Sequence, residues 1–104
     1  MLVTNQSYAA GDIVSFKMVN GDELVAKVVE QAADGWSVAS PCTVMPAQQG
    51  LGLMQSLFSA NEDCRVFLSR QHVMFHAESI EQMKAHYLKT TTGVEIIPKQ
   101  KIII

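Results

Sequence analysis

An Asn-Gly pair at residues 20 and 21 separates two segments in which apolar and polar residues alternate. Alternation with a period of two is typical of a strand that has one buried face. Asn-Gly readily adopts the positive φ angles of a two-residue hairpin turn, so the two segments are expected to pair as antiparallel strands. The sequence therefore predicts strands over residues 12–19 and 23–30, joined by a tight turn.

Three more strands are predicted further along the chain. The first covers residues 36–45 and contains Pro41, a residue that favours a sheet edge, a bend or a bulge. The other two cover residues 65–68 and 72–75, with the short turn Ser69-Arg70-Gln71 between them. The chain is therefore expected to be mainly β.

A single helix is predicted over about residues 79–90. Ser79 and Gln82 have the spacing of a capping box, and an apolar stripe follows on one face. The stripe consists of Ile80, Met83, Tyr87 and Leu88. Residues 1–11 are expected to be a loose lead-in, and residues 94–104 either add an edge strand or are partly disordered.

Residues 46–63 form an irregular but apolar connection. Met54, Leu57 and Phe58 have helical spacing, which predicts a short amphipathic turn. Two explanations for the apolar side chains stay open at this point: they cover one end of a barrel, or they form a docking surface for another subunit or partner.

The composition sets limits on size and on partners. A chain of 104 residues supports one domain, and 48% hydrophobic against 17% charged residues predicts that some apolar surface lies between subunits. A net charge of −2 argues against binding nucleic acid or acidic membranes over the whole surface. Lys84, Lys89, Lys99 and Lys101 make the C-terminal part basic, either to favour the end of the helix or to contact phosphates.

No catalytic or metal site is predicted. Cys42 and Cys64 are too few for a disulfide framework or a zinc knuckle and fit free thiols in a reducing compartment. His72 and His76 would lie about 13 Å apart on an extended strand, too far to share a metal ion. The sequence predicts no cofactor, no enzymatic activity and no membrane span, and so a soluble cytoplasmic protein.

Two side chains are candidates for contact with a ligand. Trp36 follows a turn at Asp34-Gly35 and is either part of the core or a stacking surface. Arg70 lies at a tight turn, where it is expected to be exposed. It either serves solubility or contacts a phosphate or a base.

Two stretches resemble the Sm/LSm family of small β-barrels. Residues 14–28 are similar to the first family motif, with an alternating strand before Asn20-Gly21 and a small residue, Ala26, five positions after the glycine. Residues 68–75 are similar to the second motif, although Arg70 stands where glycine is usual and Ser69 stands at the arginine position. The resemblance covers about residues 12–76, and short Sm-like proteins of marine phages are the nearest group.

The resemblance implies a fold and an assembly. The expected fold is a five-stranded, strongly bent antiparallel barrel with a C-terminal helix. Sm-type barrels form rings of about five to seven subunits by pairing the fourth strand of one subunit with the fifth strand of the next. The residues expected at this interface are Val66, Phe67, Leu68, Val73 and Phe75.

The resemblance also implies a function. A non-enzymatic ring would bind single-stranded RNA or DNA at the loops near its pore and act in nucleic-acid processing, in the host cytoplasm if the chain is of phage origin. The residues expected to contact nucleic acid are Arg70, Gln71, His72 and Trp36. The alternative is a structural or assembly module that binds other proteins through its ring or through residues 46–63.

Overall fold

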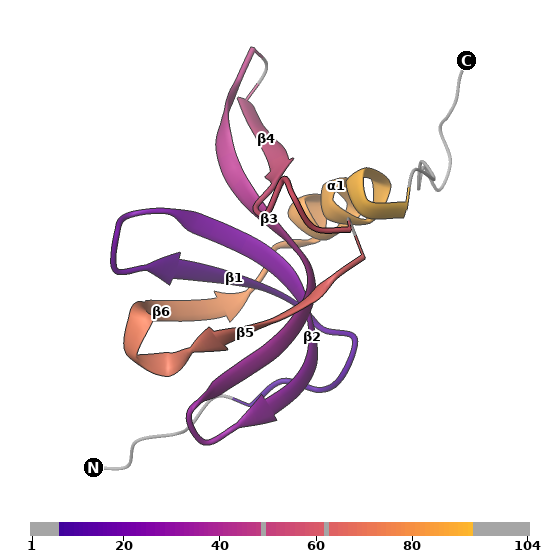
Figure 1. Cartoon of the computed structure of the whole chain (residues 1–104). Coiled ribbons are helices and arrows are strands. Elements are labelled where there is room, and N and C mark those ends of the chain that lie inside the picture. Colours follow the sequence, from indigo (N-terminus) through magenta and orange to yellow (C-terminus); the bar gives the residue numbers. More distant parts are fainter. Residues whose placement is uncertain (1–6, 49, 62, 93–104) are drawn as a thin grey trace.

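The computed structural model describes residues 7–48, 50–61 and 63–92, which form one antiparallel sheet followed by a helix (Figure 1). The elements are β1 (Ile13–Met18), β2 (Glu23–Ala32), β3 (Gly35–Ala47), β4 (Gly50–Gln55), β5 (Arg65–Ser69), the 3-10 turn η1 (Arg70–His72), β6 (Val73–Glu78) and α1 (Glu81–Thr92). The predicted mainly-β fold with one C-terminal helix is confirmed.

The strand order differs from the expected barrel. Neighbouring strands follow the order β4-β3-β2-β1-β6, and β5 also pairs with β3. β5 and β4 share the edge of β3 opposite β2, with β5 along residues 35–39 and β4 along residues 42–47. No strand pair among the described residues joins β5 to β6. The sheet therefore has six strands, not five, and is not closed into a barrel.

The extra strand, β4, contains Met54 of the predicted amphipathic turn, whereas Leu57 and Phe58 follow the strand and are not helical. It pairs with β3 from Cys42↔Gln55 to Ala47↔Gly50, and the two strands project from the body as an arm (Figure 1). The helical spacing of three apolar residues was misleading because a paired strand satisfies the backbone groups along this part of β3, which a single helical turn would not do.

The predicted β1–β2 hairpin is present, but its turn is longer than expected. The amide of Gly21 donates to the carbonyl of Met18 at 2.9 Å, and the amide of Met18 donates to the carbonyl of Asp22 at 2.8 Å. Gly21 has a φ of 98°, whereas Asn20 is not among the described residues with positive φ. The loop is thus a three-residue connection that needs glycine at its last position.

The sheet buries a core on each of its faces. The first core lies on one face and combines residues of β1, β2, β3 and β5: Val14, Phe16, Leu24, Ala26, Val28, Trp36, Val38 and Leu68. The second lies between the other face and α1: Ile13, Val25, Cys42 and Tyr87, with Met83 and Leu88 packed against it. β1 and β2 contribute alternate residues to both cores, as the pleat of a strand requires.

The helix docks through part of its predicted stripe. Tyr87 is fully buried, but Ile80 is 67% exposed and lies outside the packed face. Ser79 is not the helix cap: α1 begins at Glu81, and the Ser79 hydroxyl lies 2.7 Å from that of Ser15. No helix within the described residues is long and apolar enough to cross a membrane.

The Tyr87 hydroxyl fills a break between β2 and β3. Ser40 has a φ of 51°, and the β2–β3 register shifts close by. The hydroxyl accepts the amide of Lys27 at 3.1 Å, and it can donate to the carbonyls of Ala39 and Ser40 at 2.8 and 3.0 Å. Burial raises the pKa of Tyr87 to about 12, so the group stays protonated and can donate.

We expect Tyr87→Phe to lower the free energy of unfolding by about 1–3 kcal/mol, because it leaves buried backbone groups at the break without a partner. Urea unfolding followed by circular dichroism measures the loss. Tyr8→Phe is the matched control and should cost less, since it removes one hydrogen bond in a half-buried position. Equal small losses in both variants would show that the hydroxyl of Tyr87 does not hold the break.

Candidate functional site

The turn η1 lies against the β2–β3 turn, although the two are far apart in the sequence. The amide of Arg70 donates to the carbonyl of Asp34 at 2.8 Å, and its side-chain Nε donates to the carbonyl of Ala33 at 3.1 Å. These are the two loops to which the family resemblance pointed. Their contact is made by backbone carbonyls, so it does not depend on the side chains of the β2–β3 turn.

Arg70 lies over the ring of Trp36, with the guanidinium carbon 4.7 Å from the ring centroid. The arginine remains exposed, whereas Trp36 is fully buried. Of the two alternatives for Trp36, the structure shows the position in the core. The expectation that Trp36 contacts nucleic acid is therefore wrong, because no ring face is exposed on which a base could stack. Trp36 instead supports the guanidinium from below.

A cluster of aromatic rings lies beneath this turn. The ring of His76 is 4.7 Å from that of Trp36 and 6.2 Å from that of Phe16, measured between centroids. Its Nδ1 lies 2.6 Å from the hydroxyl of Tyr8. Burial lowers the pKa of His76, and the charge of Arg70 lowers it further. Both effects favour a neutral ring, whose Nδ1 can accept a hydrogen bond from the Tyr8 hydroxyl.

Tyr8 corrects the expectation of a loose lead-in for the described part of residues 1–11. Besides its hydroxyl contact, its amide donates to Oε1 of Gln31 at 3.0 Å. Neither contact has a local sequence signal, because the partners lie on β2 and β6. Tyr8, among the described residues before β1, is therefore held against the first core.

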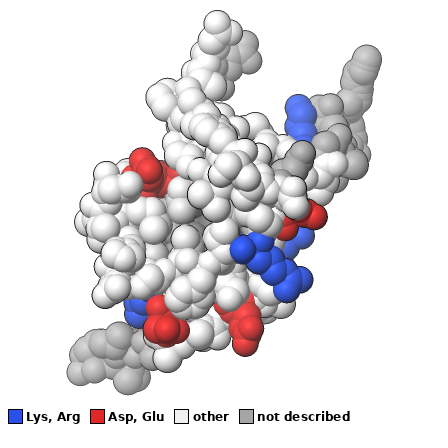
Figure 2. Space-filling view, viewed as in Figure 1, with Lys and Arg blue, Asp and Glu red and all other residues white. Residues whose placement is uncertain are grey.

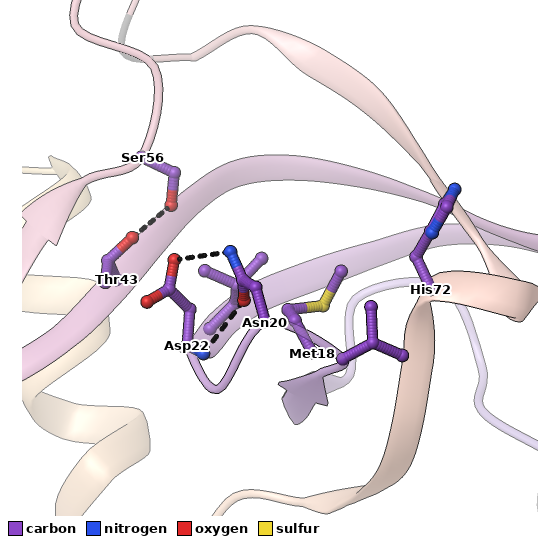
Figure 3. A pocket seen from close by; sticks show the side chains of 8 residues that line it. Met18, Asn20, Asp22, Thr43, Ser56 and His72 are labelled. Atoms are coloured by element: carbon purple, nitrogen blue, oxygen red, sulfur yellow. Dashed lines mark hydrogen bonds between the residues drawn. The ribbon is translucent and has the colours of Figure 1, made fainter.

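A groove opens at the tip of the β1–β2 hairpin, beside His72 of η1 (Figure 3). Its volume is about 430 Å³. It is lined by Met18, Val19, Asn20, Asp22, Leu24, Thr43, Ser56 and His72. Figure 3 shows Asp22 and Asn20 between the paired hydroxyls of Thr43 and Ser56 and the ring of His72. Because both apolar and polar side chains line it, the groove suits a small ligand or a side chain of a partner.

The predicted contact residues of η1 are all exposed, but their side chains face different parts of the molecule. Arg70 faces the β2–β3 turn, and His72 lines the groove. The carbonyl of His72 also accepts the amide of Val19 at 2.9 Å, which fixes η1 to the hairpin. Gln71 is exposed between them.

The predicted interface residues lie on the two strands that flank η1. Phe67 on β5 and Phe75 on β6 are 49% and 61% exposed. Val66 and Val73 are partly buried against the first core, and Leu68 is only 9% exposed. Of these five predicted residues, the two phenylalanines therefore offer the large exposed apolar side chains.

Gly35 is a residue whose role sequence reasoning missed. A Cβ built on it would lie 2.1 Å from the carbonyl oxygen of Leu68 and 2.7 Å from Cζ of Phe67. Only glycine lets β5 and the Phe67 ring approach β3 this closely. The Asp34-Gly35 pair signalled a turn, but nothing local signals this cross-strand contact.

Charge is sparse on the face shown in Figure 2, where acidic and basic side chains are scattered among uncharged ones. Lys84 does not complement the end of α1 as expected, since it lies near the start of the helix and pairs with Glu78 at 2.5 Å and Glu81 at 3.3 Å. Lys99 and Lys101 lie outside the described residues. Arg70 is thus a basic residue whose side chain and backbone both contact the β2–β3 turn.

Neither a metal site nor a similar protein indicates a function for this chain. Within residues 7–48, 50–61 and 63–92, no three His, Cys, Asp or Glu side chains come together as a metal site. No protein-family model matches the chain, and no curated protein matches it either. Function is therefore argued from the Arg70 turn, the groove and the strand edges.

We expect stability to fall as the pH drops below 6.5, and His76→Gln to flatten this dependence. The pKa of His76 in the folded protein lies below its ordinary value of 6.5, so between the two values the unfolded chain binds more protons. Its contribution is complete above 6.5 and is lost as the pH falls through this window. Urea unfolding at several pH values measures it; an identical profile in the variant would contradict the assignment.

Proposed function

We propose that the protein is a non-enzymatic, ring-forming Sm-like domain that binds single-stranded RNA or DNA at the Arg70 turn. The observation that carries this proposal is the placement of Arg70, an exposed guanidinium held between the β2–β3 turn and the ring of Trp36. The resemblance of residues 14–28 and 68–75 to the two Sm motifs supports the same function.

The strand edges support the ring. Among the described residues, β5 pairs with β3 alone and β6 pairs with β1 alone, so each strand has one edge without a partner. The two edges belong to opposite ends of the path β6-β1-β2-β3-β5. An edge of one copy can thus pair with the other edge of the next copy, and such head-to-tail contacts form a ring when the rotation closes.

A ring would make Arg70 bind nucleic acid more tightly than a single charge can. One arginine on a chain of net charge −2 would bind phosphate weakly. A closed ring repeats the same turn about one axis, so several guanidinium groups can contact one strand at the same time. The two terminal amino groups of Arg70 make no hydrogen bond to another residue in the part of the chain that the structure describes, so they can bind phosphate or a base.

A protein-binding assembly module is the second candidate. The β3–β4 arm and the residues after it carry exposed apolar side chains, which favour contact with another protein. These side chains are Met45, Leu51, Met54, Leu57 and Phe58. The acidic net charge also suits this function better than nucleic-acid binding.

We expect the contact between β5 and β6 to close a ring of about five to seven subunits, and Phe75→Asp to disrupt this ring. The new charge would be placed beside the open edge of β6, where a neighbouring strand would bury it. Light scattering on the purified protein measures the mass, with Ile80→Asp as the control because that side chain is equally exposed but lies outside the strands. A monomeric parent at micromolar concentration would rule out the ring.

We expect weak, salt-sensitive binding to single strands, with Arg70→Ala losing most of it while the oligomer stays intact. Arg70→Lys should retain only part of the binding, because the planar contact with Trp36 is lost. Arg65→Ala is the matched control, since Arg65 is also exposed but lies at the start of β5. Fluorescence anisotropy with labelled RNA and DNA at several salt concentrations distinguishes the two functions: the assembly module predicts no binding at low salt.

A further inference from the structure

The β3–β4 arm carries no charge. Residues 35–61, which include all of β3 and β4, contain no Lys, Arg, Asp, Glu or His. The projecting part of the molecule is accordingly white in Figure 2. Among the described residues β4 pairs with β3 alone, so its outer edge presents backbone donors and acceptors without a strand partner.

The edge of β4 also lacks the features that keep strand edges apart. Soluble proteins protect such edges with charged residues, proline or bulges. β6 carries Glu78 and β5 begins at Arg65, whereas β4 reads Gly-Leu-Gly-Leu-Met-Gln. An edge without any of these features can accept a further strand.

The side chains of β4 are complementary to those of a second β4. Met54 is opposite Thr43 on β3, and Gly50 and Gly52 share its face because side chains alternate. Leu51 and Leu53 lie on the other face. In an antiparallel pair centred on Gly52, Met54 of one copy is opposite Gly50 of the other, and Leu51 is opposite Leu53.

We propose that β4 pairs antiparallel with β4 of a second copy of this chain, about a twofold axis near Gly52. The absence of charge selects this partner, because a strand with charged residues would bury them here without an ion pair. The bulky Met54 then fills the space that a glycine leaves, and two leucines pack together on the other face. This contact uses neither the β5 edge nor the β6 edge.

Light scattering on the full chain tests the pairing. Leu51→Lys puts a charge at a 56%-exposed position of β4 and should halve the mass. Gln48→Lys adds the same charge to the arm outside β4 and should leave the mass unchanged. An unchanged mass in folded Leu51→Lys, or a parent mass that is an odd multiple of the chain, would overturn the proposal.

The test separates this contact from the proposed ring. If both exist, Phe75→Asp leaves a dimer, and the double variant with Leu51→Lys is a monomer. If Leu51→Lys halves the mass and Phe75→Asp does not change it, the ring fails and the β4 contact stands. If Phe75→Asp breaks the oligomer and Leu51→Lys does not change it, the β4 contact fails.

Disulfide trapping gives a second readout. Residues opposite each other in antiparallel strands are close enough for a disulfide, so Gly52→Cys should cross-link two copies on oxidation. A Cβ there would lie 3.3 Å from that of Ala47, so a small shift accommodates it. Both this variant and the control Asn61→Cys are made with Cys64→Ser, because Cys64 is free and partly exposed. No cross-link in folded Gly52→Cys would overturn the proposed register.

Discussion

The rest of the structure depends on the break between β2 and β3, which the hydrogen bonds of the Tyr87 hydroxyl stabilise. At Ser40-Pro41 the edge of β3 changes partner, from β5 before the break to β4 after it. The backbone on both sides is too distorted for a continuous ladder with β2, and the hydroxyl supplies the missing partner. The helix therefore does more than cover apolar surface, because it fixes the place where the arm leaves the body.

This break also determines where the candidate site lies. Because β5 pairs only with residues 35–39 of β3, it ends next to the β2–β3 turn, and η1 follows at once. Arg70 then meets the carbonyls of Ala33 and Asp34, and Trp36 lies beneath it. The position of the guanidinium is thus a consequence of strand pairing and of the close approach that Gly35 allows.

Sequence patterns predicted the elements whose signals are local. Alternation and Asn-Gly identified β1 and β2, the short turn at Arg70 identified β5 and β6, and apolar spacing identified α1. β4 was missed because two glycines and helical spacing hide a strand that only its pairing with β3 stabilises. The burial of Trp36, the docking of Tyr8 and the role of Gly35 all depend on contacts between distant segments, which no local pattern records.

The unpaired strand edges are the physical reason for proposing that copies of this chain assemble. Within the described residues, β4, β5 and β6 each have one edge without a partner, and exposed aromatic or aliphatic side chains accompany all three. The edges of β5 and β6 differ from each other, so the proposed contact between them would be head to tail, and it would form a ring when the rotation closes. In the proposed antiparallel register the edge of β4 is complementary to itself, so this contact would join copies in pairs. The two proposed contacts use different edges, so they would not compete, and together they would pair all three open edges found among the described residues.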